Sequence, residues 1–230
     1  MCESGERMKL HFRLPVLFLI GACLGEAALI RYDSRSTFES AYSNIVLETF
    51  ESAAVGSGTF SVIASPLSSS TNNSVFSAGS LRPGFSVGGV NSSLVVLGQG
   101  AVTGSSKAVG NSLFADNLQF LFGAGVPFAG FNYFLAEGPG SPVSGNVTIE
   151  VFGSSGSLGS YSLSTTGIQF FGVYSDADSI TRILLSGANQ TGSKFVDNVT
   201  LPGSNPIPEP GSWTLGLLGL GSLLGLRRRG

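Results

Sequence analysis

The clearest strand pattern in the chain is Asn146-Val147-Thr148-Ile149-Glu150-Val151. Its apolar side chains occupy every second position, which is the period of a β-strand with one buried face. Gly153-Ser154-Ser155-Gly156 follows, and this composition indicates a turn into the next strand. The two segments together predict a β-hairpin with one face against a core.

The period of two recurs along most of the chain, and Gly and Ser turns separate the runs. No run has Pro in its interior, and no helix is long enough for parallel crossovers. This pattern predicts an all-β, antiparallel two-sheet sandwich. The predicted strands are Ile45 to Phe50, Thr59 to Ile63, Leu94 to Leu97, Leu118 to Phe122, Ala129 to Leu135, Asn146 to Phe152, Leu158 to Leu163, Gln169 to Tyr174, Ile180 to Leu185 and Phe195 to Leu201.

Two segments depart from the strand pattern. Arg31 to Tyr42 has helical spacing of its aromatic residues and a Ser-x-x-Glu capping pattern from Ser36 to Glu39, which predicts one short helix. Ala64 to Gly89 is rich in Ser, Asn and Gly, and we expect it to cover one end of the sandwich as long loops.

The N-terminus, residues 1–27, has the pattern of a secretory signal peptide. Lys9 and Arg13 precede an apolar run from Leu14 to Leu24, and Gly25-Glu26-Ala27 supplies small residues for cleavage after Ala27. The sandwich is therefore expected to span residues 28–205.

Two alternatives concern this segment. Met8 is an alternative start, because the residues before it are polar and acidic. Ile20-Gly21-Ala22-Cys23 loosely fits a lipobox, in which Cys23 is lipidated and anchors a lipoprotein.

Composition excludes several classes of function for the mature chain. The only cysteines, Cys2 and Cys23, and the only histidine, His11, leave with the signal peptide. Thiol or imidazole catalysis, thiolate or imidazole metal sites and disulfides are therefore excluded. Residues 28–205 carry six Lys and Arg against ten Asp and Glu, a net charge of −4 without a basic stripe, so nucleic acid is not an expected partner.

The C-terminus, residues 206–230, has three parts. Pro208-Glu209-Pro210 cannot continue a helix or a sheet, because two of its residues lack an N–H and have a fixed φ. Trp213 to Leu226 is Leu-rich and predicts an apolar transmembrane helix of about 21 Å, shorter than a hydrocarbon core of about 30 Å. Arg227, Arg228 and Arg229 end the tail and are expected to stay on the cytoplasmic side.

In order and spacing, these three parts resemble the PEP-CTERM protein-sorting signal of Gram-negative bacteria. The resemblance implies recognition by an exosortase, a membrane-embedded protease, in cells that make exopolysaccharide. The expected route is export, transient anchoring in the inner membrane, and release to the cell surface or extracellular matrix.

A second resemblance covers the sandwich. The segments from Ala129 to Leu201, with Ile45 to Glu51 as the first strand, resemble the β-sandwich domain that often precedes this sorting signal. That domain is in turn similar to jelly-roll carbohydrate-binding modules. In those modules a Phe-Glu near the first strand and an Asp in the last strand often share a structural calcium ion, and Phe50-Glu51 and Asp197-Asn198 match those positions.

A physical argument supports calcium at Glu51 and Asp197. By period two, Phe195, Asp197 and Val199 share one face of a strand. If that face is buried, its carboxylate must be hydrogen-bonded, neutralised or bound to a cation, and calcium accepts carboxylate and carbonyl oxygens. The alternative is that Asp197 accepts backbone N–H bonds while Glu51 is solvated.

Several other side chains are weaker candidates for a functional site. Asp176 and Asp178 lie in a turn that could hold a cation or simply be solvated, and three tyrosines could stack on sugar rings. Acid pairs of the glycosidase type would be Glu137 with Glu150, or Glu48 with Glu51. The tyrosines are Tyr133, Tyr161 and Tyr174.

The function expected from all of this is a secreted, surface-sorted, non-catalytic β-sandwich with a structural or carbohydrate-binding role in the exopolysaccharide matrix. The alternatives are a glycan-acting hydrolase on the same fold, or a lipoprotein held through Cys23.

Overall fold

The structure is a computed structural model that describes residues 29–176, 178–187 and 192–203. The predicted signal peptide with Cys23, the sorting tail with its helix at 213–226, and both predicted domain boundaries lie outside these residues. Among the described residues, no helix is long and apolar enough to cross a membrane.

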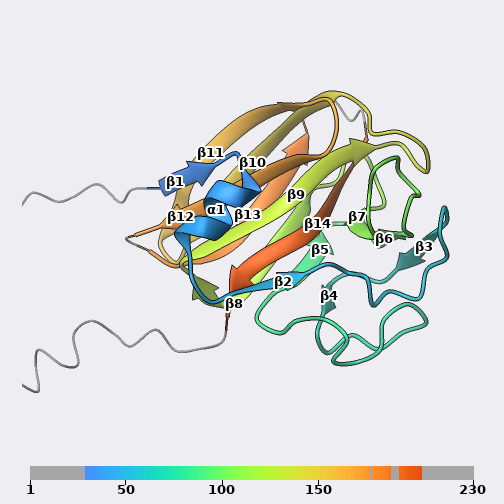
Figure 1. Cartoon of the computed structure of the whole chain (residues 1–230), viewed down its shortest axis with the longest axis horizontal. Helices are drawn as coiled ribbons and strands as arrows, with labels where there is room; N and C mark the ends of the chain where they lie inside the picture. The colour runs from blue at the N-terminus through green and yellow to red at the C-terminus, as the bar shows by residue number, and fades with distance from the viewer. Residues whose placement is uncertain (1–28, 177, 188–191, 204–230) are drawn as a thin grey trace, which may run out of the picture.

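The described chain forms two antiparallel sheets, as predicted (Figure 1). The eight-stranded sheet is built, in spatial order, from β1 (Leu29–Tyr32), β12 (Gln169–Ser175), β9 (Phe128–Ala136), β14 (Ser193–Pro202), β7 (Ala108–Asn111), β6 (Leu94–Leu97) and β3 (Phe60–Ile63), with β2 (Ile45–Glu48) also paired to β14. The six-stranded sheet is built from β11 (Gly156–Thr165), β10 (Gly145–Gly153), β13 (Ile180–Gly187), β8 (Leu118–Val126), β5 (Ser86–Gly89) and β4 (Leu67–Ser68).

The main core lies between the two sheets and follows from the alternation in the sequence. Val147, Ile149 and Val151 of β10 point into it and are fully buried, whereas the residues between them are more exposed. β10 pairs with β11 as the predicted hairpin. All ten predicted strands are present, with bounds that differ by a few residues at their ends.

The predicted helix is shorter than expected. Leu29–Tyr32 forms β1 at the edge of the eight-stranded sheet, and the helix α1 spans Arg35–Ala41. Ser34, not Ser36, caps it, because the Ser34 side chain accepts a hydrogen bond from Thr37 N. The spacing of aromatic residues could not separate a strand and a helix that meet within four residues.

α1 packs on the outer face of the eight-stranded sheet (Figure 1). Its buried residue Phe38 sits over Gly130 of β9 and Gly172 of β12, which are cross-strand partners. A Cβ at either glycine would lie within 2.8 Å of the Phe38 ring. Because the two glycines have no side chains, they leave the space in which the Phe38 ring of α1 packs.

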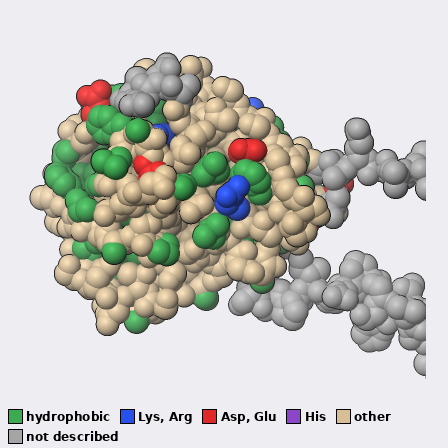
Figure 2. Space-filling model, turned by 180° about the vertical axis from the view of Figure 1, so that it is seen from behind, with side chains coloured by type: hydrophobic (Ala, Val, Ile, Leu, Met, Phe, Trp, Pro, Cys, Tyr) green, Lys and Arg blue, Asp and Glu red, His purple; other side chains and the backbone are tan. Residues whose placement is uncertain are grey.

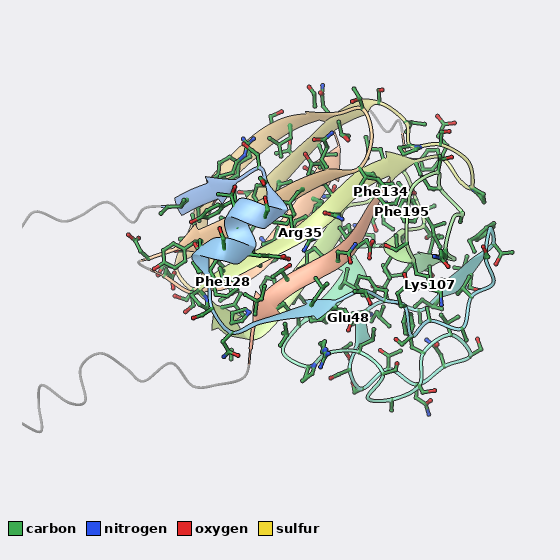
Figure 3. All side chains as sticks on the ribbon, in the orientation of Figure 1. Arg35, Glu48, Lys107, Phe128, Phe134 and Phe195 are labelled. Atoms are coloured by element: carbon green, nitrogen blue, oxygen red, sulfur yellow. The ribbon has the colours of Figure 1, made fainter. Side chains whose placement is uncertain are left out.

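Arg35 fastens the same helix to the sheet (Figure 3). Its guanidinium donates to Glu39 Oε1 at 2.8 Å, Thr200 Oγ1 at 2.7 Å and the Asn198 carbonyl oxygen at 2.6 Å. It also lies over the Phe170 ring, 4.8 Å from the centroid. These contacts join α1 to β14 and β12.

The segment predicted as long loops contains two short strands, so that prediction is wrong in part. β4 and β5 lie within Ala64 to Gly89, and β5 extends the six-stranded sheet by pairing with β8. β7 was also not predicted. Glycine occupies two of the four positions of β5 and one of the four of β7, which hides the period-two signal.

Candidate functional site

Asp197, one half of the predicted calcium pair, lies in β14 and is only 4% exposed. Burial raises its pKa to about 6. Hydrogen bonds from Ser106 Oγ and Asn198 N oppose that rise by stabilising the carboxylate. Asn198 Nδ2 also donates to it. Backbone and side-chain donors thus satisfy this carboxylate.

Glu51, the other half, lies in the turn after β2 and is 44% exposed. Its Oε1 accepts the main-chain N–H of Lys107 at 2.9 Å. Its charge raises the pKa of Asp197, so the two carboxylates interact. The two carboxylates of the predicted pair therefore lie near each other, and the consecutive residues Ser106 and Lys107 each donate a hydrogen bond to one of them.

A cation from the protein itself already lies there. Lys107 Nζ donates to the carbonyl oxygens of Glu51 at 2.9 Å and Ala53 at 2.8 Å, and lies 4.0 Å from Glu51 Oε2 (Figure 3). These are the carboxylate and carbonyl oxygens that calcium prefers. These oxygen atoms are of the type that binds calcium, but calcium would have to displace the ammonium group of Lys107. Among the described residues no three acidic, His or Cys side chains cluster in positions that could hold a metal ion.

The expectation that Phe195, Asp197 and Val199 share one face is wrong. The pairing of β14 with β9 shifts between Asp197 and Thr200, and Asn198 has a φ of 52°. This bulge puts Phe195 in a small apolar cluster with Phe134, whose ring stacks on it, and Val199 in the main core. Figure 3 shows Phe134 and Phe195 side by side on their neighbouring strands.

The other acidic candidates have structural partners. Glu48 accepts Phe50 N and Arg82 N, each at 2.7 Å. Asp178 accepts Ser154 Oγ and Ser155 N from the turn between β10 and β11, which lowers its pKa. These carboxylates hold turns in place.

The predicted acid pair of Glu137 and Glu150 is divided between the two sheets. Glu137 follows β9 of the eight-stranded sheet, whereas Glu150 lies in β10 of the six-stranded sheet, in an outward-facing position.

The tyrosines do not form a sugar platform. Tyr133 is buried in the core, where burial raises its pKa. Tyr174 stacks on Tyr42 beside α1, and Tyr161 packs at the edge of the core against Phe171.

A hollow that sequence reasoning missed lies on the outer face of the six-stranded sheet. It has a volume of about 600 Å³ and lies between β5, β8 and the loops that start at Ala64 and Val90. Its polar lining includes Ser65, Asn91, Ser92 and Gln119, and none of its lining residues carries a charge. The residues come from separate segments, and no spacing in the sequence links them.

Arg182 lies beside this hollow on the same face. In the sheet it pairs with Leu121, which lines the hollow, and with Phe152. Its guanidinium lies 3.8 Å from the centroid of the Phe152 ring, a cation–π contact that fixes its orientation. Figure 2 shows the molecule from the side opposite α1, where uncharged polar groups and backbone dominate the surface and charged side chains are few.

Comparison with known proteins adds a result for the tail. Residues 206–229 match the family model of the PEP-CTERM protein-sorting motif. The chain is thus an antiparallel β-sandwich followed by a PEP-CTERM sorting motif, and the resemblance of its tail is confirmed. The motif implies export and sorting to the cell surface in Gram-negative bacteria. A search of curated proteins found no match.

Two solved structures were also found. One is the family 11 carbohydrate-binding module from Clostridium thermocellum in complex with a β-1,3-1,4-mixed-linked tetrasaccharide, at 10% identity, covering 76% of this chain and 88% of that one, with a TM-score of 0.27. The other is the family 11 module of a cellulosomal cellulase of the same organism, at 13% identity, covering 73% of this chain and 100% of that one, also with a TM-score of 0.27. At this TM-score the likeness carries no inference about the ligand.

Proposed function

We propose that this protein is a non-catalytic, surface-sorted β-sandwich that binds neutral polysaccharide of the extracellular matrix through the outer face of its six-stranded sheet. An exosortase removes the tail after transient anchoring in the inner membrane. The sorting motif at 206–229 supports the route, because it implies sorting to the cell surface, and its resemblance implies cells that make exopolysaccharide.

The observation that carries the binding proposal is the lining of the hollow. Hydroxyl, amide and main-chain groups without a charged side chain suit the hydroxyl groups of a neutral sugar, and an acidic polymer would find no cation within the hollow. Arg182, which lies over the Phe152 ring, adds N–H donors at the border of the hollow. Gln119 lies on β8 and is therefore positioned by the sheet.

A non-catalytic role is supported by the carboxylates. Glu48 and Asp178 bind turn N–H groups, Asp197 is hydrogen-bonded, and Glu51 contacts Lys107. A glycosidase instead requires an acid pair on either side of a scissile bond.

Binding of purified protein to an array of neutral and acidic polysaccharides tests the proposal. We expect binding to neutral polymers, weakened about five- to tenfold by Gln119→Ala and by Arg182→Ala, because one lost hydrogen bond is worth about 1 to 1.5 kcal/mol. Phe60→Ser is the matched control, since Phe60 is an exposed aromatic residue on the other sheet and should leave binding unchanged. A preference for acidic polymers, equal affinity in all variants, or release of shortened glycans would contradict it.

A further inference from the structure

Lys194 and Asn111 are a buried amine and a buried carboxamide on neighbouring strands. Lys194 in β14 is 1% exposed, and Asn111 at the end of β7 is fully buried. Phe195 pairs with Gly110 and Val196 with Val109, so the antiparallel register continues to Lys194 opposite Asn111. Cross-strand partners project to the same side of a sheet, where their side chains meet.

The two nitrogen atoms converge on one oxygen. Lys194 Nζ donates to the main-chain oxygen of Asp116 at 2.8 Å, and Asn111 Nδ2 donates to the same oxygen at 3.1 Å. Lys194 Nζ also donates to the Phe114 carbonyl at 2.6 Å. The amine and the amide are therefore held side by side in the protein interior.

The amide oxygen of Asn111 is held by a main-chain donor. Lys194 N donates to Asn111 Oδ1 at 2.7 Å, so a main-chain N–H polarises the carbonyl and would stabilise negative charge on its oxygen. Burial lowers the pKa of Lys194, which favours the neutral amine that acts as a nucleophile, while the charge of Asp116 opposes this shift. Gly187 leaves room for the chain of Lys194, since a Cβ there would lie 3.0 Å from Lys194 Cε.

From this geometry we propose that Lys194 and Asn111 join spontaneously in an intramolecular isopeptide bond. Lys194 Nζ, once deprotonated, attacks Asn111 Cγ, and the new C–N bond places negative charge on Oδ1. A proton passes from Nζ to Nδ2, the Cγ–Nδ2 bond breaks, and ammonia leaves. Ammonia takes up the proton that the starting ammonium released, so the balance is one ammonium and one carboxamide consumed, one secondary amide and one ammonium ion formed.

The bond would serve a protein sorted to the cell surface. The described residues contain no cysteine, so they have no disulfide to restrict unfolding. A link between Asn111 and Lys194 would close a loop over a sequence separation of 83 residues and tie β7 to β14. This inference goes beyond the proposed function and does not depend on glycan binding.

Mass spectrometry of the denatured full-length chain tests the proposal. We expect the wild-type mass to be lower than the sequence mass by one ammonia, and a tryptic digest to contain a branched peptide that joins Asn111 to Lys194, with no cleavage after Lys194. Lys194→Arg keeps the charge and Asn111→Ala removes the carboxamide, and both should restore the full mass. Lys107→Arg is the matched control and should keep the branched peptide.

The wild-type result is decisive without any variant. A folded chain of full mass after prolonged incubation at pH 7 to 9 would overturn the proposal, as would a tryptic cut after Lys194 in most molecules. A loss of ammonia that maps to an unbranched peptide would point to succinimide formation at an asparagine and would also overturn it.

Discussion

At the residue scale, the surroundings of Asp197 should make the stability of the protein sensitive to pH and to calcium. Its carboxylate is buried and interacts with the charge of Glu51, while Lys107 supplies the nearby positive charge to Glu51. Such a group is expected to respond to conditions that change its protonation or its counter-ion.

The first prediction concerns pH. The pKa of Asp197 rises from the ordinary value of 3.8 to about 6, so the folded state binds this proton more tightly than the unfolded state. The free energy of unfolding should therefore fall as the pH rises between these values, by about 3 kcal/mol at most, and then level off. Urea unfolding from pH 3.5 to 7.5 measures this, and Asp197→Asn should lack that part of the slope. Identical pH profiles for the two proteins would contradict the assignment.

Calcium binding by Glu51 and Asp197 stays a prediction, and Lys107 sharpens its test. Excess calcium should raise the melting temperature by ligand linkage and suppress the pH slope, because the ion keeps Asp197 ionised. Asp197→Ala should abolish the rise. Lys107→Met should increase it, since the ammonium no longer competes for the carbonyls of Glu51 and Ala53. Melting curves in calcium and in chelator that coincide for the wild type and for Lys107→Met would sink the idea.

At the element scale, the packing of α1 depends on two glycines in the sheet beneath it. Phe38 reaches the strands because Gly130 and Gly172 have no side chains, and Arg35 then bonds to β14. The helix has only seven residues and would not be stable alone, so its position is set by tertiary contacts.

The prediction for this element is that Gly130→Ala loosens the helix. The added methyl group would lie 2.8 Å from Phe38 Cε1 and 2.9 Å from Phe170 Cζ, so the free energy of unfolding should drop by about 1 to 3 kcal/mol. Chemical denaturation measures it, and proteolysis near α1 should accelerate. Gly123→Ala in β8 is the matched control, because nothing lies within 4 Å of a Cβ at that position. An equal loss of unfolding free energy in both variants would show that replacing any strand glycine is destabilising, and that the contact with Phe38 is not the cause.

At the scale of the whole molecule, the sandwich and the sorting motif have separate tasks. The sandwich has a surface with few charges, and the motif at 206–229 implies sorting to the cell surface. We expect the tail to be a temporary anchor, because charged residues are costly to move through a bilayer and Arg227, Arg228 and Arg229 should keep the C-terminus inside.

The corresponding prediction is that the protein at the cell surface ends near Pro208-Glu209-Pro210 and lacks Trp213 to Gly230. Neutral replacements of the three arginines should reduce sorting, whereas Glu209→Ala should impair processing and leave membrane insertion intact. Intact mass of surface protein decides the matter. If most molecules still carry Trp213, the tail is a permanent anchor.

The fold class and the sorting signal could be predicted from the amino-acid sequence. Alternation in segments such as residues 146–151 predicts strands with one buried face, and the three-part tail is contiguous, so both can be read locally. Short strands such as β5 could not be predicted, because their glycines give no alternation of apolar and polar side chains. The end of β1 overlaps the segment that was predicted as a helix.

The surroundings of each side chain depend on the tertiary fold and could not be predicted from the sequence. The bulge at Asn198 reverses the faces of β14, Lys107 approaches the carbonyls of Glu51 and Ala53, and the hollow assembles from loops far apart in the sequence. Lys194 meets Asn111 across 83 residues for the same reason. Strand order and register set these contacts, and they depend on the packing of the whole sandwich rather than on any local pattern.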